Sequence, residues 1–237
     1  MDCNTSNIII TSKKDNSFNK KKSTVKEIRK ISNINKIYTS NNLNTKWCFW
    51  YTSRKIKNYN IPYEDRLLKF NEFTTLEDFF KCYLYVKCAS KIEKNTDISL
   101  FKNGFKPLWE LCPNSGIIFV RYKRFDNGFD LDLKWEKLLF ALIGEQFNEI
   151  SILGTTLSIR GRETVIELWF RYYNDDSKNS TEVKNLIDIK KQSLAKEFKN
   201  ILNFNINETI YFKDNLLSIR DGSTLKNVET IVLNNDV

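Results

Sequence analysis

The sequence predicts an α+β fold in which helices back one face of a curved antiparallel sheet. About eight short segments have the residue pattern of strands, three longer segments have helical periodicity, and the helices are inserted between antiparallel segments. The 237 residues are 41% hydrophobic and 14% aromatic, with only 7 Gly and 3 Pro. This composition is typical of a globular protein with an aromatic-rich core.

The strands are predicted from aromatic and β-branched runs that are bounded by polar or turn-forming residues. The run KWCFWYTS at 46–53 is strongly aromatic, and GIIFVRYKR at 116–124 alternates apolar and basic residues toward its end. Residues 155–173 are predicted to form a hairpin with its turn at Gly161 to Glu163. The remaining strands are expected at 65–73, 208–212, 216–220 and 229–233.

The three helices are predicted at 74–86, 132–147 and 181–202. Thr75 and Asp78 have the spacing of a capping box at the start of the first helix. The apolar residues of the first two helices recur every three or four positions, so each set lies on one face. These residues are Leu76, Phe79, Phe80 and Tyr83 in the first helix, and Trp135, Leu138, Leu139, Leu142 and Ile143 in the second.

Residues 1–42 differ in composition from the rest of the chain, being rich in Asn, Ser and Lys. Residues 1–40 contain nine Lys/Arg and three Asp/Glu, so they carry +6 of the formal net charge of +9. This composition is typical of a solvated, disordered tail, with a basic arm for RNA or nuclear import as an alternative. We expect residues 43–237 to form one domain that contacts a polyanion through a focused pocket.

Several classes of function are excluded by the residue types present. The chain has five Cys at irregular spacing and no His, so it lacks zinc-ligand spacing, a Ser-His-Asp triad and HExxH. We therefore expect no enzyme activity and no cofactor or metal. Reduced thiols, the lack of a signal peptide and the lack of a membrane span favour a cytoplasmic protein, with a nuclear location also open. We also expect the protein to be a monomer.

The residues GFKPLWE at 104–110 place a tryptophan directly before a glutamate. An aromatic ring stacks on a purine base, and a carboxylate accepts hydrogen bonds from guanine N1–H and N2–H₂. A positive charge on the base, as in N7-methylguanine, strengthens stacking through cation–π attraction. Arg160 and Arg162 alternate at a strand end, where both guanidinium groups point the same way and suit phosphate. Trp169 and Arg171 lie on the return strand.

Six segments resemble the mRNA cap-binding initiation factor 4E family in their order and spacing. They are NTKWCFWYTSRK, FNEFTTLEDFFKCYLYV, SLFKNGFKPLWE, WEKLLFALIGEQF, LSIRGRETVIELW and DGSTLKN, and the resemblance covers residues 43 to about 230. It implies an eight-stranded antiparallel sheet with three helices on its convex face. It also implies a pocket for the 7-methylguanosine mRNA cap on the concave face, and so a function in translation initiation.

The resemblance assigns roles to individual positions of this sequence. Tyr63 and Trp109 correspond to the two walls that stack the base, and Glu110 to the acceptor on the guanine edge. Trp169 matches the tryptophan near the methyl group. The matched phosphate-binding positions are Arg160, Arg162 and Arg220, whereas a further lysine of the family falls at Val165.

The resemblance also implies a groove on the convex face for a scaffold initiation factor or repressor that carries a YxxxxLΦ helix, where Φ is apolar. The matched positions are Asn42, Leu76, Phe80, Trp135 and Glu136. Phe80 replaces the usual tryptophan, Asn42 replaces a proline, and Glu136 stands where the major initiation isoforms have an apolar residue.

Three functions therefore stay open at the level of sequence. The chain recruits capped mRNA for translation initiation through a scaffold partner, or it is a cap-binding repressor of the class II (4E-homologous) type. The second alternative rests on Tyr63, Glu136 and Val165. A third alternative is an interaction module with a degenerate pocket whose tail makes non-specific RNA contacts.

Overall fold

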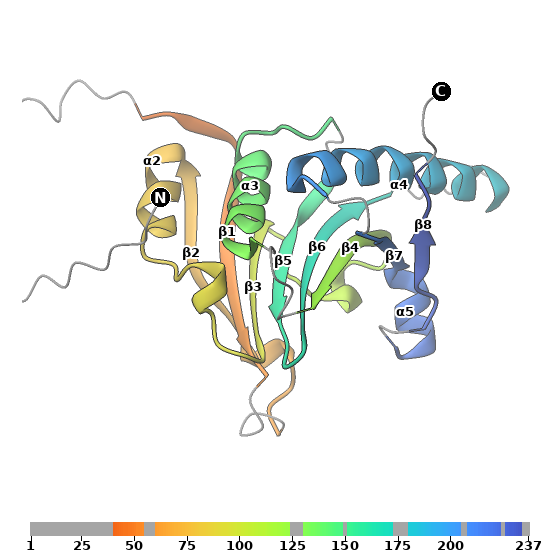
Figure 1. Cartoon of the computed structure of the whole chain (residues 1–237), viewed down its shortest axis with the longest axis horizontal. Helices are drawn as coiled ribbons and strands as arrows, with labels where there is room; N and C mark the ends of the chain where they lie inside the picture. The colour runs from red at the N-terminus through yellow and green to blue at the C-terminus, as the bar shows by residue number, and fades with distance from the viewer. Residues whose placement is uncertain are drawn as a thin grey trace, which may run out of the picture. The chain divides into compact units, whose positions relative to one another are not determined.

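The computed structural model describes residues 40–54, 60–123, 130–148, 151–172, 180–204, 208–223 and 226–233 (Figure 1). A compact unit begins at Asn41 and contains every element discussed below. The tail predicted at 1–42 lies outside the described residues except for its last three positions. No helix in these ranges is both long enough and apolar enough to cross a membrane.

Eight strands form one curved antiparallel sheet in the order β2-β1-β3-β5-β6-β4-β7-β8. All seven strand pairings are antiparallel. The strands are β1 (Asn42–Ser53), β2 (Leu67–Thr75), β3 (Thr96–Lys102), β4 (Ser115–Lys123), β5 (Ile152–Ile159), β6 (Glu163–Arg171), β7 (Ile210–Asp214) and β8 (Glu229–Ile231).

Three helices cover the convex face of this sheet, as Figure 1 shows. They are α2 (Leu76–Tyr83), α3 (Leu131–Ile143) and α4 (Ser180–Leu202). The larger hydrophobic core lies between them and the sheet, with Phe79, Leu138 and Phe198 fully buried. The predicted cap of α2 is present, because Thr75 Oγ1 accepts a hydrogen bond from the Asp78 N–H at 3.1 Å.

The concave face carries a smaller apolar cluster that includes Trp50, Phe101, Ile117, Phe119 and Trp169. Because strand residues alternate between the two faces, these side chains point away from the helices. No residue of α2, α3 or α4 belongs to this cluster. Its outer surface is therefore the floor of the concave side, where a ligand has room to bind.

Two strand assignments made from the sequence differ from the structure. Residues 216–220 were expected to be a strand, but Asn215–Asp221 form a fourth helix, α5. The Asp214 carboxylate caps this helix by accepting from the Leu217 N–H at 3.0 Å, and Gly222 ends it with φ of 59°. The run at 96–102 was not predicted as a strand, yet it is β3, which pairs with both β1 and β5. The predicted total of eight strands is correct because these two errors cancel.

Candidate functional site

A pocket of about 440 Å³ lies on the concave face of the sheet. It gathers five of the seven predicted base- and phosphate-binding residues, and they come from four separate parts of the chain. Tyr63 precedes the short 3₁₀ helix η2 (Glu64–Arg66), and Arg160 follows β5. Trp109 and Glu110 begin the 3₁₀ helix η4 (Trp109–Leu111), and Trp169 lies in β6.

Trp109 and Glu110 are adjacent residues of η4, and both line the pocket. The Trp109 side chain is half-buried and that of Glu110 is exposed. Helix η4 is anchored from behind, because the Cys112 carbonyl accepts a hydrogen bond from Ser115 Oγ at 2.5 Å. The Asn215 amide at the start of α5 donates to the same Ser115 Oγ at 2.7 Å. Within the described part of the chain the Glu110 carboxylate makes no hydrogen bond or ion pair, so its oxygens are available to a ligand.

Tyr63 also lines the pocket and has two guanidinium groups beside its ring. The Cζ atoms of Arg54 and Arg66 lie 5.1 and 5.4 Å from the ring centroid. Burial, and then the charge of Asp97, raise the pKa of the Tyr63 phenol, while Arg54 opposes this shift. The phenol therefore stays neutral at physiological pH. The quadrupole of the Tyr63 ring already attracts these two cations, and it would attract the positively charged ring of a methylated guanine in the same way.

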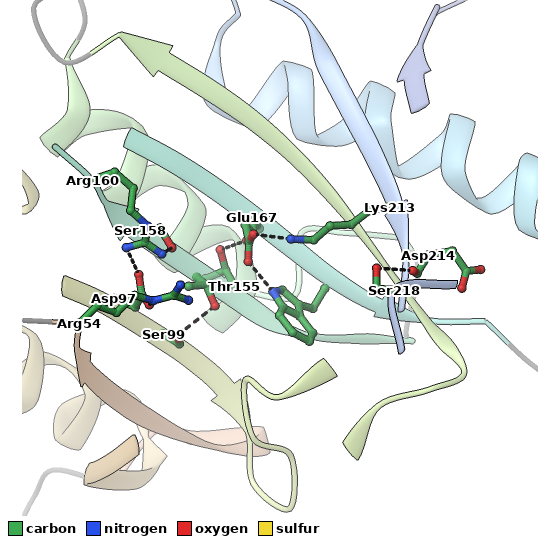
Figure 2. Close-up of polar contacts among 12 residues, drawn as sticks. Arg54, Asp97, Ser99, Thr155, Ser158, Arg160, Glu167, Lys213, Asp214 and Ser218 are labelled. Atoms are coloured by element: carbon green, nitrogen blue, oxygen red, sulfur yellow. Dashed lines mark hydrogen bonds and ion pairs between the residues drawn. The ribbon is translucent and has the colours of Figure 1, made fainter. Parts of the chain in front are cut away.

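The Asp97 carboxylate connects Arg160 to Arg54 across the floor of the pocket (Figure 2). Its Oδ1 lies 2.6 Å from Arg160 Nη1, and its Oδ2 accepts from Arg54 Nε at 2.8 Å. Arg160 also donates to Ser158 Oγ at 3.1 Å. Asp97 is only 3% exposed, so it holds the two guanidinium groups from beneath. Arg160 is thus fixed at the pocket wall.

Trp169, Glu167 and Lys213 form a second polar group at the base of the pocket. Glu167 accepts a hydrogen bond from Trp169 Nε1 at 3.1 Å and one from Lys213 Nζ at 2.9 Å, the second of which Figure 2 shows. The Trp169 ring packs edge-on against Phe101, with 5.4 Å between the ring centroids. Trp169 is 5% exposed, so it is part of the floor and presents only a small surface to the pocket.

Arg162 and Arg220 do not line the pocket. Arg162 is exposed in the turn between β5 and β6, and Arg220 is exposed near the end of α5. Arg220 Nε forms an ion pair with Asp221 Oδ1 at 3.0 Å. Since both side chains are on the surface, a phosphate contact by either one requires that the side chain move or that the ligand extend beyond the pocket.

Six charged residues of the pocket were missed from the sequence, namely Arg54, Asp97, Arg121, Glu163, Glu167 and Lys213. Each lies in or at the end of a strand, where a single charged side chain is ordinarily read as facing solvent. The segments CFWYTSRK and GIIFVRYKR contain two of them. The signal that could have identified them is the alternation within each strand, since each shares a face with apolar residues of the concave cluster.

The predicted partner-binding residues lie on or beneath the convex side. Phe80 is 39% exposed, Leu76 and Glu136 are half-buried, and Asn42 is exposed at the start of β1. Trp135 differs, because it is only 3% exposed and belongs to the core. Its side chain packs beneath this surface in the structure, and a direct partner contact of Trp135 stays a prediction.

Aromatic side chains from α2 and α3 form one cluster on that surface. The rings of Phe80 and Tyr83 each meet the ring of Phe140 edge-on, with centroid separations of 5.7 and 5.6 Å. The Tyr83 hydroxyl donates a hydrogen bond to Glu136 Oε1 at 3.1 Å. Glu136 is thus tied to the cluster by a specific contact.

Comparison with known proteins agrees with this architecture. The sequence model of the family described as "Eukaryotic initiation factor 4E" matches residues 42–230. The chain is 32% identical over 189 residues to "Eukaryotic translation initiation factor NCBP" of Arabidopsis thaliana, covering 78% of each chain. It is 31% identical over 194 residues to "Eukaryotic translation initiation factor 4E" of Aplysia californica, covering 80% of this chain and 83% of that protein.

Solved structures of similar fold also belong to this group of proteins. One is C. elegans eIF4E-3 in complex with the 4E-binding protein Mextli and a cap analog, with a TM-score of 0.64 and 27% identity. The similarity covers 77% of this chain and 96% of that one. Another is Ascaris suum eIF4E-3 with an m7G cap, with a TM-score of 0.63, 26% identity, and coverage of 82% and 97%. The chain described here belongs to the eukaryotic initiation factor 4E family.

Proposed function

We propose that this protein binds the 7-methylguanosine cap of mRNA in the concave pocket and brings capped mRNA to the translation machinery. The observation that carries the proposal is the convergence of Tyr63, Trp109, Glu110, Arg160 and Trp169 on one cavity. These residues come from segments far apart in the sequence, and each supplies a different part of the chemistry that a cationic guanine nucleotide needs.

In this proposal Tyr63 and Trp109 stack on the two faces of the methylated base. The Glu110 carboxylate accepts hydrogen bonds from guanine N1–H and N2–H₂, and its negative charge also attracts the cationic ring. Arg160 holds a phosphate while Asp97 fixes its orientation. Trp169 lies in the floor, where it contacts the methyl group. The pocket binds and releases the cap unchanged, so the protein acts as a binding factor and not as an enzyme.

Recruitment requires a second contact, which we assign to the convex face. A related protein of similar fold has been solved with the 4E-binding protein Mextli, which shows that such folds bind partner proteins. Here the exposed ring of Phe80 and the half-buried side chains of Leu76 and Glu136 would receive the YxxxxLΦ helix of a scaffold initiation factor. We place this activity in the cytoplasm, where translation initiates.

The experiment is a titration of the wild-type protein and of Glu110→Gln with 7-methyl-GTP, followed by tryptophan fluorescence. Gln keeps the shape of the side chain but offers only one acceptor oxygen and no charge, so binding should weaken by about 30-fold or more. Glu64→Gln is the matched control, because Glu64 is an exposed carboxylate nearby that pairs with Lys106 and does not line the pocket. Equal affinity of the wild type and Glu110→Gln would refute the assigned role.

A second candidate function is repression of translation by a protein that holds the cap but engages the scaffold poorly. The contact between Tyr83 and Glu136 favours it, because it fixes a carboxylate on the surface where the partner's apolar residues would dock. A pull-down with a scaffold YxxxxLΦ peptide separates the two functions. Tight binding, together with support of cap-dependent translation, would exclude a purely repressive role.

The third candidate, an interaction module with a degenerate pocket, makes a different prediction. RNA binding would then depend steeply on salt and would not distinguish a methylated from an unmethylated cap. The available Glu110 carboxylate and the fixed Arg160 argue against it, because a degenerate site has no reason to keep either in place.

A further inference from the structure

Helix α5 is connected to the 3₁₀ helix η4 by one buried chain of hydrogen bonds. The Asn215 amide donates from Nδ2 to Ser115 Oγ at 2.7 Å, and Ser115 Oγ donates to the Cys112 carbonyl at 2.5 Å. Cys112 directly follows η4, which contains Trp109 and Glu110. The first residue of α5 is thereby linked to the two residues proposed to stack the base and to read its edge.

The direction of this chain of hydrogen bonds is fixed by the groups at its two ends. A backbone carbonyl only accepts, so the single hydroxyl proton of Ser115 is donated to Cys112 and the Ser115 oxygen accepts from Asn215. Asn215 Nδ2 also donates to the Cys112 carbonyl at 3.4 Å, where the oxygen of a flipped amide would be repelled. Hydrogen bonds in series polarise one another, so the three groups hold the end of η4 more firmly than separate contacts would.

The linked side chains are enclosed by protein. Asn215 and Ser115 are fully buried, and Cys112 is buried as well. Asn215 Oδ1 has no hydrogen-bond partner among the residues that the structure describes. A buried polar atom without a partner destabilises a fold, so an apolar side chain at position 215 would be more stable if packing were its only role. The amide therefore has a role beyond packing, and the groups that can perform it are its N–H donors.

The two ends of the link differ in how firmly they are held by other contacts. Asp214 caps α5 by accepting from the Leu217 N–H, and it also accepts from the Tyr172 hydroxyl at 2.6 Å. Asn215 comes directly after this cap and is fixed by it. In contrast, η4 is only three residues long and ends just before Pro113, which cannot continue a helix. The orientation of η4 thus depends on contacts from outside it.

We propose that Asn215 is a positioning residue for cap recognition, which fixes the orientation of Trp109 and Glu110 through Ser115. This inference rests on the proposed function and assigns a role to a residue that acts from behind the pocket wall. Trp109 must meet the face and Glu110 the edge of the same flat base, so a small rotation of η4 misaligns both contacts at once. The affinity for the cap is therefore tied to α5, which is remote from Trp109 in sequence.

The first test compares the binding of 7-methyl-GTP to the wild type, Ser115→Ala and Asn215→Leu by fluorescence titration. Ser115→Ala removes only the bridging hydroxyl, and Asn215→Leu keeps the approximate volume of the amide but offers no donor. Each variant should bind about fivefold more weakly or worse, because the hydrogen bonds to the Glu110 carboxylate lose their alignment. The double variant should bind within about twofold of the weaker single variant, because either change breaks the same chain.

Ser218→Ala is the matched control for this comparison. Ser218 is a buried residue of the same helix, and its hydroxyl donates to the Asp214 carbonyl at 2.8 Å. Its removal should lower the stability of α5 and leave the affinity for 7-methyl-GTP within about twofold. If Ser218→Ala weakens binding as much as Ser115→Ala does, the loss reflects the stability of α5 in general, and the inference is overturned.

A second measurement follows Trp109 in the protein without ligand. The chain has five tryptophans, so protein labelled with 5-fluorotryptophan gives five fluorine NMR resonances, and Trp109→Phe identifies the one from Trp109. In Ser115→Ala and Asn215→Leu this resonance should shift or broaden more than the other four. A loss of affinity with an unchanged Trp109 resonance would overturn the inference, because η4 would then not have moved.

The outcomes separate this inference from the proposed function. If the wild type binds 7-methyl-GTP and both variants bind it equally well, Asn215 does not position the pocket, and the inference is overturned while cap binding stands. If Asn215→Leu does not fold, Ser115→Ala decides by the same criterion. If the wild type does not bind 7-methyl-GTP, the proposed function fails and this inference fails with it.

Discussion

The guanidinium of Arg54 lies over the ring of Tyr63, with its Cζ atom 5.1 Å from the ring centroid. The same guanidinium donates to Asp97, which also holds Arg160. A single chain of contacts therefore joins the residue proposed to stack the base to the residue proposed to hold a phosphate. Neither Arg54 nor Asp97 needs to touch the ligand for this link to matter, since both act by fixing the two residues that do.

Arg54→Met should weaken the binding of 7-methyl-GTP by about tenfold, because Tyr63 loses the cation over its ring and Asp97 loses one of its two partners. Arg66→Met is the control, since Arg66 also lies over the Tyr63 ring, at 5.4 Å, but forms no ion pair with Asp97 among the described residues. That variant should weaken binding by no more than about threefold. Equal effects of the two variants, measured by fluorescence titration, would show that the link through Asp97 does not contribute to the affinity for 7-methyl-GTP.

Phe80→Ala should reduce the affinity for a scaffold YxxxxLΦ peptide by about tenfold or more and leave the binding of 7-methyl-GTP unchanged. Phe80 is the exposed member of the aromatic cluster and lies on the face opposite the pocket. Tyr85→Ala serves as the control, because Tyr85 is 92% exposed just beyond α2. Calorimetry with the peptide gives the measurement, and a larger loss in Tyr85→Ala than in Phe80→Ala would contradict the proposed docking surface.

Lys134 connects α3 to the end of α4, and its removal should destabilise the fold without affecting the pocket. Its Nζ donates to the Leu202 carbonyl at 2.8 Å and lies 3.3 Å from Glu208 Oε1, and the residue is 8% exposed. Lys134→Met removes the donor to that carbonyl and the buried cation beside that carboxylate, so the free energy of unfolding should fall by about 2–4 kcal/mol.

Lys137→Met on the same helix is the control and should change the free energy of unfolding by less than about 0.5 kcal/mol. Urea denaturation gives both values. If Lys134→Met is as stable as Lys137→Met, the contact with the end of α4 does not stabilise the protein.

The buried Tyr172 phenol should make stability fall at alkaline pH. Burial, and then its hydrogen bond to Asp214 Oδ2 at 2.6 Å, raise the pKa of this phenol above its usual value. The folded state therefore retains the proton more strongly than the unfolded chain, in which tyrosine ionises near pH ~10. This stabilisation is complete below about pH 10 and is lost as the pH rises above it.

Tyr172→Phe should be about 1–2 kcal/mol less stable than the wild type at pH 7, and the difference should narrow above about pH 10. The measurement is the free energy of unfolding in urea at a series of pH values from about pH 7 to pH ~11. A difference that stays constant over this range would contradict the assigned contact.

The sequence predicted most of the fold because its strands and helices have distinct periodicities. The stripe of Trp135, Leu138 and Leu142 on α3 is buried as the spacing required. The run at 216–220 was assigned wrongly because LLSIR has the composition of a strand. Its caps at Asp214 and Gly222 outweigh that local preference and make it helical. The strand β3 was missed because its two neighbours, β1 and β5, are remote in sequence and supply the pairing that makes it a strand.

The pocket was predictable only where a motif marked it. Trp109 and Glu110 are adjacent in sequence, and the resemblance gave the position of Tyr63. Asp97 could not be identified in the same way, because its contacts to Arg54 and Arg160 depend on the register of three strands. Arg121 was visible as a basic residue in an alternating strand, but only the pairing with β6 places it opposite Val165.

The most direct test of the central claim is the ratio of the dissociation constants for GTP and 7-methyl-GTP, measured by quenching of tryptophan fluorescence under identical conditions. The two ligands differ by one methyl group and one positive charge on the base, so the ratio reports the stacking of a cation between Tyr63 and Trp109. A cation–π gain of about 2 kcal/mol or more predicts that GTP binds at least about 30-fold more weakly. Equal dissociation constants would show that the pocket does not recognise the methylated cap, and would contradict the account.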